Sequence, residues 1–197
     1  MINLNNNGHH FILASKSPRR QFLLAETGLK FEVKTIETDE TYPAHLKCEE
    51  IAVYISRNKA LAFDMEKLPA GTVLISADTV VWLGDESLAK PGDEAEAAAM
   101  LQKLSGKGHT VVTGMCLRSR ERLHCFYEKT EVFFRELEPA EIEYYIKNYK
   151  PFDKAGAYGI QEWIGYVGVE RIEGCYYNVM GLPVQKLFTE LREFTGN

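Results

Sequence analysis

Basic residues in the first turn of a predicted helix are the strongest chemical signal in this sequence. An apolar segment ends at two hydroxyl residues, Ser15 and Ser17, and is followed by Pro18, Arg19 and Arg20. Ser17 is a suitable N-cap, and Pro18 suits the first helical position, where no amide donor is needed. Arginines here add positive charge to the positive end of the helix dipole, which costs stability unless an anion lies between them. The pattern is compatible with a phosphate site. A solvated helix start that merely carries basic residues is the alternative.

A carboxylate inside an apolar run is the second candidate. Asp78 stands within residues 75–81, which are otherwise typical of buried β structure. A lone carboxylate in such a place is costly unless it is paired, bound to a metal or facing a cleft. An aspartate that caps a turn is the alternative. Because the apolar sequence resumes directly after Asp78 and leaves little room for a turn, we interpret this residue as functional.

Three other charged residues are candidates for the site only in combination with the motifs above. Lys90 precedes a proline at the end of a predicted hairpin, Lys59 lies on a predicted helix, and Glu40 lies in a polar loop. Taken singly, each is typical of an exposed surface residue.

The segment 150–161 is rich in glycine and follows a predicted helix. Gly156 and Gly159 permit backbone conformations that other residues resist, so the loop could carry amides to a ligand. Lys154 could neutralise phosphate, and Gln161 could form paired hydrogen bonds with the edge of a base. The spacing matches neither a Walker loop nor the dinucleotide fingerprint. A simple turn is the alternative.

The elements that must position these residues follow from hydrophobic periodicity. It predicts strands over residues 11–15, 31–36 and 72–76, a hairpin over 80–90, strands over 109–118 and 122–135, and short strands within 163–179 around a turn at 173–174. It predicts helices over residues 18–27, 49–66, 93–104 and 138–149, and a last one after Pro183. This mixture indicates an α/β fold with a mixed sheet rather than strict βαβ repetition.

Composition sets further bounds. The chain has 197 residues, enough for one large domain or two small ones that share a core. Its net charge of −5 argues against a general nucleic-acid binder, which would normally show a basic excess. No apolar run approaches the roughly 20 residues that a membrane span needs. The polar start of the chain is not a secretory signal, so we expect a cytoplasmic protein. The four cysteines form no C-x-x-C pair, and we expect reduced thiols.

Taken together, the motifs resemble a known family. LASKSPRR, TDET, NKA, SADTVV, AKP and DKAGAYGIQ occur in this order, and this series is similar to the Maf family of nucleoside triphosphate pyrophosphatases. The resemblance covers about residues 11 to 190, and DKAGAYGIQ is similar to the branch that acts on dTTP and UTP. We therefore expect an N-terminal extension over residues 1–10 and a single domain over residues 11–197. The family implies a mixed sheet flanked by helices, with two lobes and a cleft between them, as in Maf and ITPase-like proteins.

The resemblance also implies a reaction. A nucleoside triphosphate is cleaved between its α and β phosphates to the monophosphate and pyrophosphate, with a divalent cation, Mg²⁺ or Mn²⁺, whose ligands the sequence does not reveal. The family assigns the general base to Asp78 and implicates Arg19, Thr79 and Gln161 in substrate choice. It suggests a homodimer. We expect catalytic roles for Asp78, Glu40, Lys59 and Lys90. We expect substrate to be bound by Ser15, Ser17, Arg19, Arg20, Thr79, Asp153, Lys154 and Gln161.

Two alternatives stay open. The same reaction could act on other or modified nucleotides, since the motifs do not name every substrate. The protein could instead be a nucleotide-binding regulator of cell division without turnover, although binding alone needs no acid beside the phosphates. We expect neither nucleic acid nor membrane as a partner.

Overall fold

The computed structural model describes residues 8–196, which form an α/β fold around one mixed sheet. The described strands of the sheet are ordered β2-β1-β3-β5-β6-β7, with β4 also paired to β3. Strand β1 runs parallel to β2 and β3, and the remaining pairs are antiparallel. The strands are β1 His10–Leu13, β2 Phe31–Val33, β3 Thr72–Leu83, β4 Glu86–Leu88, β5 Gly108–Arg118, β6 Leu123–Phe134 and β7 Val169–Glu173. The expected mixed sheet is confirmed.

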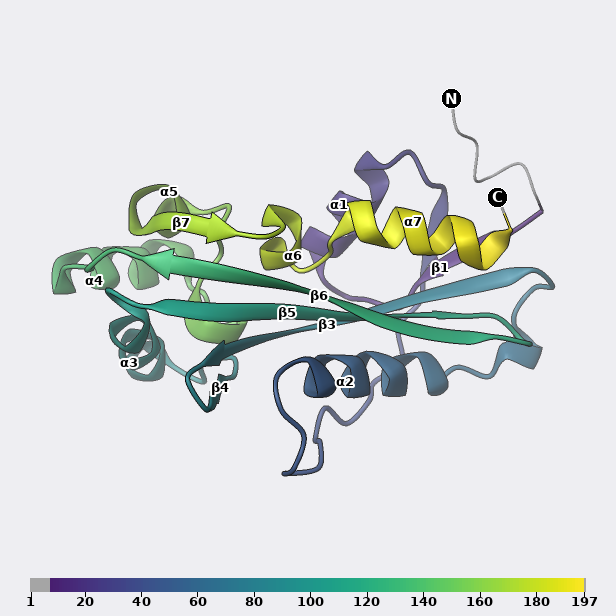
Figure 1. Ribbon diagram of the computed structural model, residues 1–197, viewed down its shortest axis with the longest axis horizontal. Helices are drawn as coiled ribbons and strands as arrows, with labels where there is room; N and C mark the ends of the chain where they lie inside the picture. Colours follow the sequence, from purple (N-terminus) through teal and green to yellow (C-terminus); the bar gives the residue numbers. More distant parts are fainter. Residues whose placement is uncertain (1–7, 197) are drawn as a thin grey trace.

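Helices cover both faces of the sheet (Figure 1). They are α1 Pro18–Glu26, α2 Glu49–Leu61, α3 Glu94–Leu104, α4 Pro139–Tyr149, α5 Trp163–Gly168, α6 Tyr176–Met180 and α7 Val184–Thr195, with short 3₁₀ turns at Met65–Lys67 and Ala155–Ala157. Helices α1 and α7 lie on one face and α2 on the other, while α3, α4 and α5 gather at the far end of the long strands. The long strands β3, β5 and β6 thus join two lobes, as expected.

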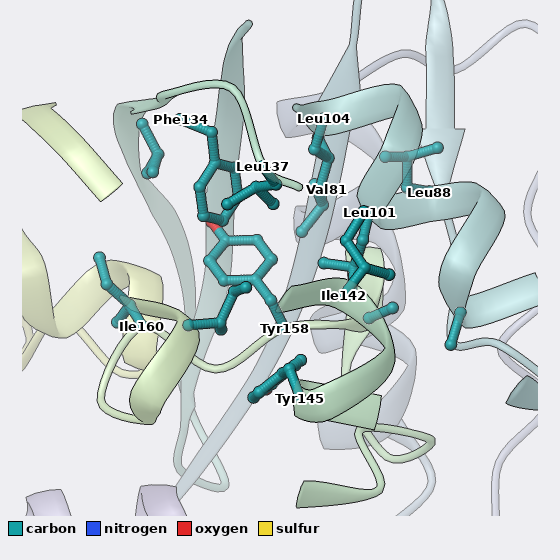
Figure 2. Close-up of a cluster of buried hydrophobic side chains, with 14 of the residues drawn as sticks. Val81, Leu88, Leu101, Leu104, Phe134, Leu137, Ile142, Tyr145, Tyr158 and Ile160 are labelled. Atoms are coloured by element: carbon teal, nitrogen blue, oxygen red, sulfur yellow. The ribbon is translucent and has the colours of Figure 1, made fainter. Parts of the chain in front are cut away.

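Each lobe has its own apolar core. In the first lobe, Phe11 and Leu13 of β1 pack with α1 and α7 on one face, and Ile12 packs on the opposite face, where α2 lies. All three side chains are buried, as expected for a strand covered on both sides. In the second lobe, Tyr158 lies in the middle of a cluster built from α3, α4 and the sheet, with Phe134 beside it (Figure 2).

A gap in the pairing of β3 positions the site. Strand β1 pairs with β3 only as far as Ile75, and β4 begins to pair with it at Val81. Between these points, among the described residues, β3 has a strand partner only on its β5 side. Side chains from both faces of the sheet can therefore reach the same stretch of strand. Asp78 and Thr79 lie in this stretch.

The structure corrects several predicted elements. Asp78 does not follow a strand that ends at residue 76, because β3 continues through it to Leu83. The segment 163–179 contains α5, β7 and α6 rather than strands alone, with β7 ending at Glu173. The predicted helix over residues 49–66 is divided into α2 and a 3₁₀ turn. Much of the expected extension over residues 1–10 lies outside the described residues.

The cysteines also differ from expectation. Cys116 and Cys125 face each other directly on β5 and β6, with Cα atoms 4.2 Å apart, and form a disulfide, whereas Cys48 and Cys175 are free. The expectation of four reduced thiols is therefore wrong for this pair. It failed because the register of a hairpin, not cysteine spacing, brings the two together. Within residues 8–196, no helix has the length and apolar character needed to cross a membrane.

Candidate active site

Two adjoining cavities open along the gap in β3, with volumes of about 120 Å³ and about 540 Å³. They share lining residues from both lobes, including Arg19, Lys59, Lys90 and Asp153. The smaller, inner cavity reaches Gln161 and Thr79, and the larger, outer one reaches Ser15 and Glu40. The lining of the two cavities includes every site residue expected from the sequence: Ser15, Ser17, Arg19, Arg20, Glu40, Lys59, Asp78, Thr79, Lys90, Asp153, Lys154 and Gln161.

A lysine joins two carboxylates at the centre of the cleft. Lys59 Nζ lies 2.6 Å from Asp78 Oδ1 and 2.6 Å from Glu40 Oε1. Lys90 Nζ lies 3.7 Å from Glu40 Oε2. Burial by itself raises the pKa of Glu40, but the bonds and charges of Lys59 and Lys90 outweigh it and hold that pKa below its ordinary value. The cluster thus places two carboxylates within reach of two cations.

Helix α2 reaches Asp78 because β5 carries a glycine opposite it. Gly114 is the direct partner of Asp78 in the β3–β5 register, so the two residues share a face of the sheet. A Cβ atom at Gly114 would lie 2.2 Å from the carbonyl carbon of Ala52 in α2. The missing side chain therefore lets the helix backbone approach the sheet closely. This approach brings Lys59 of α2 down to Asp78.

Arg20 ties three elements together under the cleft. Its Nε donates to Gly181 O and its Nη1 to Ala77 O, both over 2.8 Å, and its Nη2 donates to Thr79 Oγ1 over 2.9 Å. Burial lowers the pKa of this guanidinium. All three of its nitrogens are therefore engaged with protein. This differs from a freely available phosphate ligand, and it explains why a second arginine in the first helical turn is tolerated.

Arg19 instead bridges the two lobes. Its Nη1 lies 2.8 Å from Asp153 Oδ2, and Lys154 Nζ lies 2.8 Å from Asp153 Oδ1. Burial raises the pKa of Asp153, but hydrogen bonds from Lys154 and Arg19 outweigh it and hold that pKa below its ordinary value. Lys154 also lies 3.1 Å from Glu162, which accepts a hydrogen bond from the Tyr145 hydroxyl.

The glycine-rich loop acts differently from the sequence-based expectation. The amide of Gly156 donates to Ala89 O and that of Gly159 to the Tyr145 hydroxyl, so neither is free for a ligand. Gly156 has a φ of 69°, and a Cβ there would press against Val81. The glycines therefore pack the loop against the sheet. What the loop offers to the cleft is Gln161, whose buried Oε1 has no hydrogen-bond partner. An unpaired buried acceptor is costly and marks a place where a ligand can donate.

Metal-ligating side chains do not cluster in the described part of the chain. Residues 8–196 contain no group of three or more histidine, cysteine, aspartate or glutamate side chains arranged to hold a metal ion. Glu40 and Asp78, each 2.6 Å from Lys59, are carboxylates of the type through which Mg²⁺ binds together with substrate phosphates and water.

A model of the family described as Maf-like protein matches residues 10–194, nearly the whole chain. The chain belongs to the Maf-like protein family. Proteins named dTTP/UTP pyrophosphatase are similar to it: one from Phocaeicola vulgatus is 53% identical over 186 residues, covering 94% of this chain and 96% of that protein. One from Bacteroides fragilis is 50% identical with the same coverage. One from Porphyromonas gingivalis is 46% identical over 188 residues, covering 94% of each chain.

A solved structure of the Staphylococcus aureus Ham1 protein is also similar, with a TM-score of 0.42 and 16% identity over 64% of this chain and 71% of that one.

Sequence reasoning missed residues that support this Maf-like cleft without lining its two cavities. Glu162 follows Gln161 directly and holds Lys154, yet an acid at that position carries no distinctive spacing. Thr113 and Asn178 hydrogen bond beneath Thr79 and are fully buried. The signal that could have found them is polarity within apolar runs, the same signal that identified Asp78.

Proposed function

We propose that this protein is a nucleoside triphosphate pyrophosphatase that hydrolyses dTTP and UTP to the monophosphate and pyrophosphate. The observation that carries the proposal is the position of Asp78: a carboxylate in a cleft, 2.6 Å from Lys59 and flanked by further cations. The names and high identity of the relatives support the same substrates.

The residues of the outer cavity fit the needs of a triphosphate. Phosphoryl transfer depends on positioning and charge neutralisation more than on covalent chemistry by the protein. Arg19, Lys59 and Lys90 line the cavity and supply positive charge. Arg19 and Lys59 are already paired with carboxylates, so in this proposal the phosphates take over part of those contacts.

In this mechanism Asp78 acts as the general base. Water attacks phosphorus in line with the bond that breaks, the α–β anhydride opens, and pyrophosphate leaves. The proton of the attacking water passes to the Asp78 carboxylate. We propose that Glu40 and Asp78 would hold a divalent cation, Mg²⁺ or Mn²⁺. When bound, this cation supplies further charge neutralisation to the phosphates.

Gln161 supports the choice of base. Uracil and thymine share an acceptor–donor–acceptor edge, and a terminal amide offers both a donor and an acceptor to it. The inner cavity also carries apolar side chains, Val81, Val111 and Met180, against which a planar ring can pack.

A hydrolysis panel tests the proposal. The purified chain is incubated with dTTP, UTP, CTP, GTP, ATP and modified triphosphates, with Mg²⁺ or Mn²⁺ and with EDTA. Monophosphate and pyrophosphate from dTTP and UTP are the expected products, in a cation-dependent reaction. Preferential cleavage of another or a modified nucleotide would support the first alternative. Tight nucleotide binding without turnover would contradict the proposal and support the regulator.

We further propose a cytoplasmic homodimer, which the family resemblance supports. Size-exclusion chromatography with light scattering measures the mass of the protein in solution. A monomer at micromolar concentration would contradict the dimer.

A further inference from the structure

A line of hydroxyl groups beneath the cleft fixes the direction of one hydrogen bond at its surface. Arg20 Nη2 donates to Thr79 Oγ1, which lies 2.9 Å from Thr113 Oγ1. Thr113 Oγ1 lies 3.1 Å from the backbone carbonyl oxygen of Asn178. A guanidinium only donates, a carbonyl oxygen only accepts, and each hydroxyl has a single hydrogen. All three contacts are hydrogen bonds in one arrangement only, in which the hydrogen of Thr113 points at Asn178 and the hydrogen of Thr79 points at Thr113.

Thr113 and Asn178, the buried end of this line of hydrogen bonds, are fixed by further contacts. Thr113 and Asn178 are completely buried. The Asn178 side chain accepts from the Thr113 amide over 3.1 Å and donates to Val111 O and to Thr130 Oγ1, both over 2.9 Å. Every polar atom of that side chain is paired. The carbonyl of Asn178, which also accepts from the Gly181 amide, is thus fixed in place. If Thr113 donated to Thr79 instead, two acceptor oxygens would face each other over 3.1 Å.

Thr79 consequently turns an acceptor toward the cleft. Its hydrogen is committed to Thr113, one lone pair receives Arg20, and only a lone pair remains for a ligand. Thr79 alternates with Asp78 along β3, so it lies on the opposite face of the strand from the Asp78–Lys59 pair. It lines the inner cavity together with Val81 and Val111, where a planar base can pack.

We propose that Thr113, held by Asn178, is a positioning residue for base selection. It keeps Thr79 as an acceptor for the imide N3–H of uracil or thymine, and it disfavours cytosine because the N3 atom of cytosine is itself an acceptor. This inference rests on the proposed function. Gln161 cannot make the choice alone, since half a turn of its terminal amide exchanges donor and acceptor. Base selection needs a group that can only accept a hydrogen bond from the base, and Thr79 is such a group.

Replacing Thr113 with valine tests the proposal, because valine removes the hydroxyl that receives the Thr79 hydrogen. The hydrogen of Thr79 is then free to turn into the cleft and donate to cytosine N3. We expect the CTP-to-UTP ratio of kcat/KM to rise about tenfold, the scale of one buried hydrogen-bond mismatch. The dCTP-to-dTTP ratio should rise in parallel. These ratios do not depend on the fraction of folded protein, so a merely structural loss would leave them unchanged.

Thr113→Ser is the matched control, since it keeps the hydroxyl and should keep the wild-type ratio. Dissociation constants for UTP and CTP, measured on the same three proteins without divalent cation, give a readout that does not require turnover. If the wild-type protein binds UTP more tightly than CTP but cleaves neither, the proposed pyrophosphatase function is contradicted. The positioning role of Thr113 is then still tested by the dissociation constants. An unchanged CTP-to-UTP ratio in Thr113→Val would overturn the positioning role, as would an equal rise in Thr113→Ser.

Discussion

At the scale of single residues, Asp78 is paired with Lys59, whose position does not depend on Asp78 alone. Lys59 also contacts Glu40, so neutralising Asp78 leaves the lysine paired with a carboxylate. The cleft should therefore keep its shape when the charge of Asp78 is removed. This separates a chemical role of Asp78 from a structural one.

Asp78→Asn should lower kcat for dTTP and UTP by about a thousandfold, the scale of general-base catalysis, and leave the circular dichroism spectrum unchanged. Steady-state assays of released pyrophosphate measure the effect. Glu86→Gln is the matched control, because Glu86 is also a carboxylate paired with a lysine, Lys103 at 2.8 Å, but lines neither cavity. Wild-type turnover by Asp78→Asn would remove this residue from the mechanism.

Gln161→Glu should lower kcat/KM for dTTP and UTP about tenfold or more, because an ionised carboxylate only accepts hydrogen bonds and cannot pair with the carbonyl groups of the ring. A nucleotide panel on the variant measures this change. Gln185→Glu, which makes the same substitution at an exposed position on α7, should leave the panel unchanged. Unaltered substrate preference in Gln161→Glu would refute the role of the amide.

At the scale of elements, the approach of α2 to β5 decides whether Lys59 reaches Asp78. Gly114 permits this approach, because a side chain there would collide with the backbone of Ala52. The collision cannot be relieved by a side-chain rotation. It can be relieved only if the helix moves away from the sheet.

Gly114→Ala should therefore lower the free energy of unfolding by about 2 kcal/mol, as overpacking does in other cores. It should also lower kcat, because the displaced helix draws Lys59 away from Asp78. Urea unfolding and kcat measurements test both effects. Gly92→Ala is the control, since a Cβ at Gly92 meets only the Glu96 side chain at 3.4 Å. Full stability of Gly114→Ala would show that α2 does not need this close approach.

The success of element prediction depended on local signals. Helix α1 was located by its own end signals: Ser17 accepts from the Arg20 amide as the N-cap, and Gly28 takes a positive φ just beyond the helix. The segment 163–179 lacked such signals. Its two helices, α5 and α6, have only six and five residues, too short for apolar periodicity to show. The tertiary structure stabilises them by packing against the sheet and the second core.

At the scale of the whole molecule, a histidine in the second lobe links pH to stability. His109 is buried, its Nε2 lies 2.7 Å from the Tyr158 hydroxyl, and its Nδ1 has no hydrogen-bond partner. Burial lowers the pKa of His109 from 6.5 to about 4. The unfolded chain therefore binds a proton more readily than the folded one between these pH values, and acid favours unfolding.

The wild-type protein should lose stability as pH falls from 6.5 toward 4, with His109 accounting for about 3 kcal/mol of the loss. His109→Gln removes the titrating group and should flatten this part of the profile, even if it is less stable at neutral pH. Urea unfolding at several pH values measures the slope. His45→Gln, at an exposed histidine, should keep the wild-type slope. Equal slopes for His109→Gln and wild type would contradict the assignment.

The amino-acid sequence by itself determined which residues gather in the cleft and the class of the fold. Apolar periodicity is local and could be read without coordinates, whereas residues such as Lys59 and Glu40 were expected only because the motifs resemble the Maf family. The expected residues do line the two cavities. Only the tertiary structure decided what each of them faces. It tied Arg20 to Gly181, Ala77 and Thr79, joined Asp78 to Glu40 through Lys59, and paired Cys116 with Cys125. These contacts depend on strand register and on the approach of a helix to a glycine, which join residues far apart in the chain.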